Sequence, residues 1–137
     1  MKRKYLHKAG GLLIKDRKVL LERHGGKDIY IVPGGKLEAG ESAQEALIRE
    51  CEEEFHIAVK ETDLEYVGKF ASRATHNPDK IVQIETFIIK KWQGEITLDD
   101  GIEGIVWVNA KTMKDYNVSD IAENNILPLL LKMQLID

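Results

Sequence analysis

Residues 42–54 constrain the fold more than any other part of the sequence, because they combine a helix start signal with an amphipathic pattern. Ser42 and Glu45 form a capping box, in which a hydroxyl and a carboxylate three residues apart accept hydrogen bonds from backbone N–H groups at the helix start. At about 100° per residue, the apolar side chains of this helix fall in one stripe about 100° wide, as expected for a helix packed on a sheet. They are Leu47, Ile48, Cys51 and Phe55. We therefore predict a helix here that covers a β-sheet.

Short apolar runs on both sides of this helix indicate β-strands. Before it they cover residues 12–14, 19–21 and 29–32, and after it residues 64–70, 81–92 and 105–108. The polar residues 15–18 predict a turn between the first two strands. Pro33, Gly34 and Gly35 cannot continue the third run, so we expect a loop from there to about Ser42.

Residues 120–133 have the pattern of a closing helix, which Pro128 is expected to kink or split. Strands on both sides of a central helix, with a second helix at the end, predict the α/β class. We expect an α/β/α sandwich with a mixed β-sheet between helices, because short turns alternate with a helical crossover. No repeat or linker divides the chain, so residues 1–137 are expected to form one domain.

Composition limits the location and the partners. The single cysteine excludes an intramolecular disulfide, and no apolar stretch approaches the roughly 20 residues of a membrane span. The apolar run after the basic start is too short for a signal peptide, so we expect a cytoplasmic protein with no membrane association. A net charge of −3 gives no long-range attraction for nucleic acid. An anionic substrate would therefore need a metal or local basic groups.

Three glutamates on the predicted helix, Glu50, Glu53 and Glu54, occupy positions i, i+3 and i+4 and share one face, where like charges repel. Grouped carboxylate oxygens suit a hard cation such as Mg²⁺ or Mn²⁺. Ala43 and Ala46 precede them on that face, and we expect their small side chains to leave room for an ion and a phosphate. A face of this kind is more often a solvated surface, so the metal interpretation depends on the surrounding sequence.

The surrounding sequence resembles the Nudix box. From Gly35 the chain has five residues, Glu41, seven residues, Arg49-Glu50, two residues, Glu53-Glu54, one residue and His56-Ile57. With average residue usage, a chance match of the six fixed residues at a given start is on the order of one in ten million. The resemblance covers residues 35–57, and residues 30–34 are similar to the strand and turn before the box in MutT-like members. The strand order also resembles that family's α/β/α sandwich.

The resemblance implies a metal-dependent pyrophosphohydrolase and assigns roles to the residues of the box. Its three helix glutamates would bind Mg²⁺ or Mn²⁺, with the carbonyl of Gly34 as a further ligand. Arg49 would orient the glutamates, and Glu41 would brace the loop or assist the metal shell.

The implied reaction is attack by a metal-activated water on a phosphorus of a nucleoside diphosphate linked to another group. The general base stays open between a helix glutamate and a later acidic residue. Glu103 and Asp100 are the later candidates, and an ordinary surface-loop role is the alternative for both.

Two positions depart from the box. Cys51 replaces a bulky aliphatic residue, but it lies in the apolar stripe, where a buried thiol behaves as a small hydrophobe. No basic partner is evident that would lower its pKa for catalysis. His56 replaces the glycine that ends the helix, and a left-handed backbone costs a histidine about 1 kcal/mol. We therefore expect a relaxed or shifted helix end.

Four residues are candidates for substrate contact. Lys36 and Arg23 stand where MutT-like proteins have phosphate- or base-contacting residues, with solubilising surface charge as the alternative. Tyr30 and Phe70 are candidates for base stacking, although aromatic residues in strands more often belong to the core.

The substrate class follows only from the resemblance. Members that prefer ADP-ribose tend to carry a proline about 15 residues after the box, and diadenosine polyphosphate hydrolases a tyrosine slightly later. Residues 72–75 contain neither. This favours a nucleoside triphosphate, oxidised forms included, over ADP-ribose, dinucleoside polyphosphates or nucleotide sugars. Residues 72–80 are expected to form a polar loop that helps set the choice.

The resemblance has two alternatives to a pyrophosphohydrolase. A non-catalytic nucleotide-sensing Nudix domain would not need all three glutamates together. A diphosphate isomerase of this fold usually needs a reactive cysteine outside the box, and Cys51 lies inside it. A homodimer is common among relatives, and only the resemblance supports one here.

Overall fold

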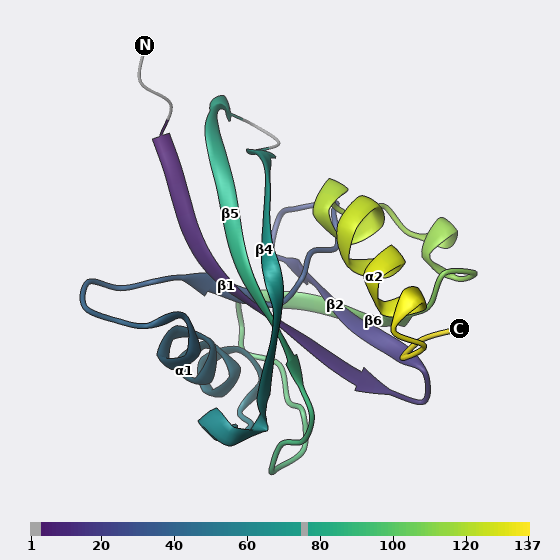
Figure 1. Ribbon diagram of the computed structural model, residues 1–137, viewed down its shortest axis with the longest axis horizontal. Helices are drawn as coiled ribbons and strands as arrows, with labels where there is room; N and C mark the ends of the chain where they lie inside the picture. The colour runs from purple at the N-terminus through teal and green to yellow at the C-terminus, as the bar shows by residue number, and fades with distance from the viewer. Residues whose placement is uncertain (1–3, 75–76) are drawn as a thin grey trace.

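The computed structural model describes residues 4–74 and 77–137, and these residues form a six-stranded sheet whose main path runs β4-β5-β1-β2-β6 (Figure 1). Helix α1 (Ala43–Phe55) covers one side of the sheet, and the helical C-terminal segment covers the other (Figure 1). The pairing is mixed, because β1 and β5 run parallel while β4 and β5 run antiparallel. The predicted α/β fold with a mixed sheet between helices is therefore confirmed.

The strands other than β3 extend beyond the apolar runs that predict them, but β5 ends at Ile89, so the expected strand over 81–92 is wrong for its last three residues. Their bounds are β1 (Lys4–Lys15), β2 (Lys18–His24), β3 (Gly34–Lys36), β4 (Leu64–Ala74), β5 (Asn77–Ile89) and β6 (Ile102–Val108). Backbone pairing continues through polar residues that an apolar pattern misses, as between β1 and β5. The predicted turn after β1 is confirmed: Asp16 and Arg17 have φ of 52° and 60°, the conformation of a two-residue hairpin turn.

The segment before α1 differs from the sequence prediction. Residues 29–32, expected to form a strand, make only isolated bridges, one of them between Ile31 and Glu22. Residues 34–36, expected to form a loop, are strand β3, which pairs with residues 8–10 of β1. Residues 14–15 of β1 pair with residues 18–19 of β2. Residues 8–10 lie on the same edge of β1, nearer its start, and pair with β3. Glycine supplies the backbone for this pairing and at Gly34 is required, because φ is 145° and a Cβ would collide with the carbonyl oxygen of Ala9.

Helix α1 starts as predicted. Ser42 accepts from the backbone N–H of Glu45, and the Glu45 side chain accepts from that of Ser42. The expectation for Ala43 and Ala46 is wrong, because both are buried in the core with Leu47 and Cys51 rather than leaving space above the glutamates. Their small side chains let the helix approach the sheet closely, so the buried stripe is wider than the large apolar residues alone indicate.

The closing helix is split near Pro128, as predicted. The π-helical turn η3 (Ala122–Ile126) leads directly into α2 (Leu127–Lys132), and Pro128 lies in the first turn of α2. Proline lacks the N–H that would continue the regular hydrogen bonding, so the helix changes type there. Ile126 and Leu130 from this segment pack in the core beside β1 and β2.

Three smaller features complete the description. The short 3₁₀ turns are η1 (Glu61–Asp63) and η2 (Met113–Asp115). Across residues 4–74 and 77–137, no helix has the length and apolar character needed to cross a membrane. His56 ends α1 with φ 57° and ψ 35°, so it adopts the left-handed conformation itself, and the helix end does not shift.

Replacing His56 with glycine is expected to raise the free energy of unfolding by up to about 1 kcal/mol, because glycine adopts a left-handed backbone without a clash at Cβ. Urea denaturation of both proteins measures the difference. His56→Ala is the matched control, since it removes the imidazole and its 4.0 Å approach to Asp99 but keeps the Cβ. Equal stability of the glycine and alanine variants would contradict the strain interpretation.

Candidate active site

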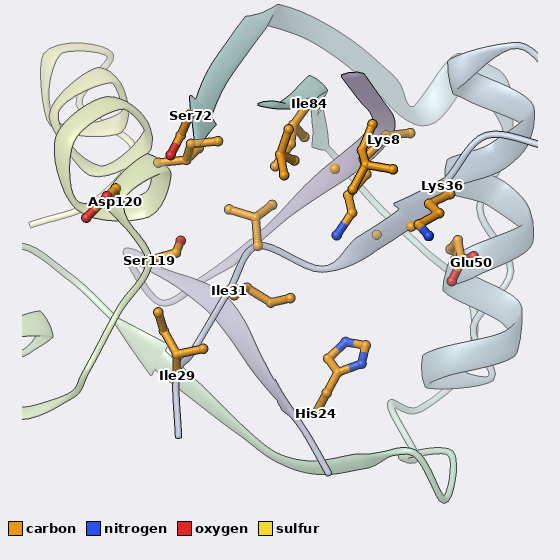
Figure 2. Close-up of a pocket in the computed structure, with 18 of the residues that line it drawn as sticks. Lys8, His24, Ile29, Ile31, Lys36, Glu50, Ser72, Ile84, Ser119 and Asp120 are labelled. Carbon is orange, nitrogen blue, oxygen red and sulfur yellow. The ribbon is translucent and has the colours of Figure 1, made fainter. Parts of the chain in front are cut away.

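A cavity of about 630 Å³ opens between β1, the end of β2, β3 and α1 (Figure 2). Charged side chains gather at the end beside α1, where Figure 2 shows Lys8, Lys36 and Glu50. The opposite end lies beside the C-terminal helical segment, and its lining includes Ser72, Ser119 and Asp120. Apolar side chains, such as those of Ile31 and Ile84, lie between the two ends. The cavity therefore suits a ligand with one strongly anionic part and one less polar part.

Arg49 is the centre of the polar network on α1. Its guanidinium donates to both carboxylate oxygens of Glu41, at 2.8 and 2.9 Å, to Glu50 at 2.9 Å and to Glu53 at 3.2 Å. It also donates to the backbone carbonyl of Lys36 at 3.1 Å, which ties the helix to β3. Charge-assisted contacts of this kind fix orientation as well as charge, which is what an orienting arginine requires.

The same network fixes the charge state of Glu41. Its hydrogen bonds from Arg49 and from the Glu38 backbone N–H lower the pKa of Glu41 to about 2. Glu41 in turn contributes most to raising the pKa of Arg49. Glu41 is thus a carboxylate at neutral pH that braces the loop before the helix.

The three helix glutamates differ in their surroundings. Glu54 is 8% exposed, the side chain of Glu50 is 16% exposed, and both line the cavity. The side chain of Glu53 is 58% exposed and is not among the described residues that line it, although Arg49 holds it beside Glu50. The sequence pattern does not distinguish the three, but in the fold Glu54 and Glu50 face the sheet and are shielded, while Glu53 is exposed. Their roles as metal ligands stay predictions, as does that of Gly34, which also lines the cavity.

Three residues that the sequence pattern did not single out complete the charged end of the cavity. Glu22 on β2 is fully buried, Lys8 on β1 lines the cavity, and the Nε2 atom of His24 lies 3.1 Å from Oε1 of Glu22. A polar residue two positions after the buried Leu20, on a strand where alternate residues share a face, is the signal that could have identified Glu22.

Burial at this end of the cavity destabilises the charged forms of Glu54 and Lys8. Burial, and then the carboxylates of Glu22 and Glu50, raise the pKa of Glu54. Burial and the nearby Lys36 lower the pKa of Lys8, so its ammonium is also costly there. The Oε2 atoms of Glu22 and Glu54 are buried without a hydrogen-bond partner. Buried carboxylate oxygens of this kind fit a divalent cation, which neutralises them and accepts oxygen ligands.

The later acidic candidates lie elsewhere. Glu103 accepts from the Arg23 guanidinium at 2.6 Å and from the Gly26 backbone N–H at 3.2 Å. Arg23 lowers the pKa of Glu103, so this carboxylate is engaged in an ion pair. Asp100 is exposed in the turn before β6. In the described part of the chain, neither Glu103 nor Asp100 lines the cavity.

Of the four residues predicted to contact substrate, the described lining of the cavity includes one. Lys36 lines the cavity, whereas Arg23, Tyr30 and Phe70 are absent from its described lining. Tyr30 packs edge-on against Tyr116 with ring centroids 5.5 Å apart, and the Arg23 guanidinium lies 5.9 Å from the centre of the Tyr30 ring. Tyr30 and Phe70 also pack against the core beside α2. Their proposed contacts with substrate stay predictions.

The polar segment 72–80 lies mostly in strands rather than in a loop. Ser72 and Arg73 belong to β4 and Lys80 belongs to β5, and all three line the cavity. Thr75 and His76, in the middle of this segment, lie outside the described residues.

Cys51 is buried in the core under α1. Burial raises the pKa of its thiol to about 12, and nearby carboxylates act in the same direction. The thiol is therefore protonated at neutral pH and packs as an apolar side chain.

A Cβ at position 35 would overlap the carboxylate of Glu50, so Gly35→Ala is expected to displace Glu50. We expect Mn²⁺ binding to weaken at least about tenfold, the scale found when groups that support metal ligands are altered. Isothermal titration with Mn²⁺ measures this change. Gly101→Ala is the control, because an added Cβ there meets no atom within 4 Å. Unchanged affinity in Gly35→Ala would show that the position of Glu50 does not matter for binding.

Comparison with known proteins identifies the family. The family model described as NUDIX domain matches residues 5–128. An 8-oxo-dGTP diphosphatase of Proteus vulgaris is 31% identical over 107 residues, which cover 74% of this chain and 90% of that protein. An ADP-ribose pyrophosphatase of Methanocaldococcus jannaschii is 33% identical over 104 residues, covering 72% of this chain and 60% of that protein.

The fold agrees with this assignment. The crystal structure of a MutT protein from Methanosarcina mazei Go1 superimposes with a TM-score of 0.79 at 18% identity and covers 98% of both chains. The sequence prediction of a Nudix-type pyrophosphohydrolase is confirmed. The chain belongs to the NUDIX domain family.

Proposed function

We propose that this protein hydrolyses a pyrophosphate bond of a nucleoside triphosphate, oxidised forms included, with Mg²⁺ or Mn²⁺ as its metal. The observation that carries the proposal is the charged end of the cavity, where Glu50 and Glu54 lie beside Lys8 and Lys36. Carboxylates can hold a cation that faces phosphate, while lysines hold phosphate oxygens directly. An acidic protein can in this way bind an acidic substrate.

The metal would be held by Glu50, Glu53 and Glu54, together with the backbone carbonyl of Gly34. The buried, unpartnered Oε2 of Glu54 and the glycine at position 35, where a Cβ would strike Glu50, both fit such a ligand set. A bound divalent cation supplies neutralisation of the phosphate charge and a lowered pKa for water.

The protein's own residues then position the reactants. Arg49 keeps Glu50 and Glu53 in fixed orientations through its guanidinium, and Glu41 keeps Arg49 in place. We propose that a helix glutamate, Glu53 or Glu50, accepts the proton of the attacking water. Glu103 is the weaker candidate, because it is held in an ion pair with Arg23.

The other end of the cavity is proposed to hold the nucleobase. Ile31 and Ile84 offer apolar surface, and Ser119 and Asp120 offer hydrogen-bonding groups beyond it (Figure 2). A base has an apolar face and a polar edge, so this combination suits it. The relatives named for 8-oxo-dGTP and for ADP-ribose both remain models for the substrate, and the absence of a proline from residues 72–75 favours the triphosphate. A cytoplasmic location and a homodimer also stay predictions.

Hydrolysis is tested with the purified chain, Mg²⁺ and a panel of nucleotides. The panel contains nucleoside triphosphates with normal and oxidised bases, ADP-ribose, dinucleoside polyphosphates and a nucleotide sugar, and released phosphate or pyrophosphate is measured. We expect turnover with a triphosphate, and a fall in kcat of at least about 100-fold in Glu53→Gln, because loss of a metal ligand or base typically costs this much. Absence of turnover with every substrate, or equal rates in the variant, would refute the proposal.

The cavity lysine gives a second prediction. Lys8→Met keeps the length of the side chain but removes its charge, so KM for the triphosphate is expected to rise roughly tenfold, the scale of one charge-assisted hydrogen bond. The decrease in kcat should be smaller. Lys69→Met, on the exposed surface of β4, is the matched control. Steady-state kinetics that show the same KM for both variants would contradict a phosphate contact at Lys8.

A further inference from the structure

Glu22, His24 and Glu54 form a compact group where the end of β2 meets α1. A carboxylate oxygen from each glutamate and a ring nitrogen of His24 all lie within 4.8 Å of one another. Only Glu54 belongs to the box, and Glu22 and His24 come from a strand about 30 residues earlier in the chain. The group is therefore formed by the fold rather than by a local motif.

This group is buried without enough positive charge. Glu22 is 0% exposed and Glu54 is 8% exposed, and the Oε2 atom of each lacks a hydrogen-bond partner. Among the ion pairs of the described residues, none joins Lys8 to either carboxylate within 4.0 Å. Two neighbouring carboxylates at this depth destabilise the fold unless a charge compensates them, and among the described residues the ion pair of Glu22 is with His24, while Glu54 has none.

A proton shared between the two carboxylates is the simplest alternative. It would neutralise one of the two charges, and His24 would then serve only as a hydrogen-bond partner of Glu22, whose Oε1 lies 3.1 Å from Nε2. A divalent cation would compensate both carboxylates and would accept the imidazole as a third ligand. Figure 2 shows the His24 ring on the same side of the cavity as Glu50.

We propose that Glu22, His24 and Glu54 form a binding site for a divalent transition metal, which shares Glu54 with the cation of the box. The imidazole sets the preference, because Mg²⁺ favours oxygen ligands with water, whereas transition metals such as Mn²⁺ also accept nitrogen. This inference extends the proposed function by adding a second cation position beside the first. It predicts a metal whose ligand shell includes nitrogen, which the box glutamates alone cannot supply.

The test uses the full chain loaded with Mn²⁺ and pulsed electron paramagnetic resonance, which detects ¹⁴N nuclei bonded to the metal. We expect ¹⁴N modulation in the wild type, its loss in His24→Gln, and its retention in His7→Gln, which changes an exposed histidine of β1. Absence of the signal in the wild type, or its persistence in His24→Gln, would overturn the proposed site.

A second variant separates metal binding from folding. Glu22→Gln preserves shape and removes one buried charge, so the metal-free protein should have a higher Tm than the wild type. The same variant should bind Mn²⁺ at least about tenfold more weakly by titration and gain less Tm from it. A higher Tm with unchanged Mn²⁺ affinity would instead indicate the shared proton and would overturn the metal site.

Glu53→Gln distinguishes this inference from the proposed function. It should lose hydrolysis and keep the ¹⁴N signal, because Glu53 lies outside the group. If the wild type hydrolyses nucleotides but shows no ¹⁴N signal, the second site fails and the proposed function stands. If the signal appears without turnover on any substrate, the proposed function fails and the second site stands.

Discussion

The close approach of two glycines to their neighbours determines how the rest of the site is arranged. Gly34 lies against the carbonyl of Ala9, and Gly35 lies against the carboxylate of Glu50, with no space for a Cβ at either position. This contact lets β3 pair with β1 while α1 lies directly above it. Glu50 and Glu54 are thereby brought to the edge of a strand rather than to open solvent, and the cavity forms where these elements meet. A bulkier residue at Gly34 would push β3 away from β1, and one at Gly35 would displace the carboxylate of Glu50.

The carboxylates at this junction form two groups that differ in how their charge is compensated. Around Arg49, the carboxylates of Glu41, Glu50 and Glu53 share one guanidinium, and this part of the site is satisfied by the protein itself. Around Glu54 and Glu22, burial is greater, the Oε2 atom of each is unpartnered, and among the described residues only the His24 ring contacts the other oxygen of Glu22. The carboxylates held by Arg49 therefore lie beside carboxylates whose charge is not fully compensated. This arrangement suits a site that must keep its geometry without a ligand and yet gain free energy when a cation enters.

The sequence identifies those parts of the fold that depend on local rules. The capping box at Ser42 and the spacing of the glutamates locate α1 and its chemistry, because both arise within a few helical turns. Strand β3 is missed, since a glycine-rich run pairs through its backbone and offers no side-chain pattern. Glu22 is missed for a different reason: alternation with Leu20 places it on the buried face of β2, but no local pattern predicts that it meets Glu54, about 30 residues farther along the chain. The failures thus lie where distant segments meet, and that is where this site is built.

The residues of the Nudix box do not identify the substrate, because distant segments also line the cavity. The box supplies part of the charged end of the cavity, whereas the opposite end is lined by Ser72, Ser119 and Asp120, all outside residues 35–57. Those positions lie on β4 and at the start of the C-terminal helical segment, away from the box in the sequence. Two relatives named for different nucleotides match this chain almost equally well, at 31% and 33% identity. Under the proposed function, selectivity among nucleotides would therefore depend on side chains outside the box, and these can change while the box stays the same.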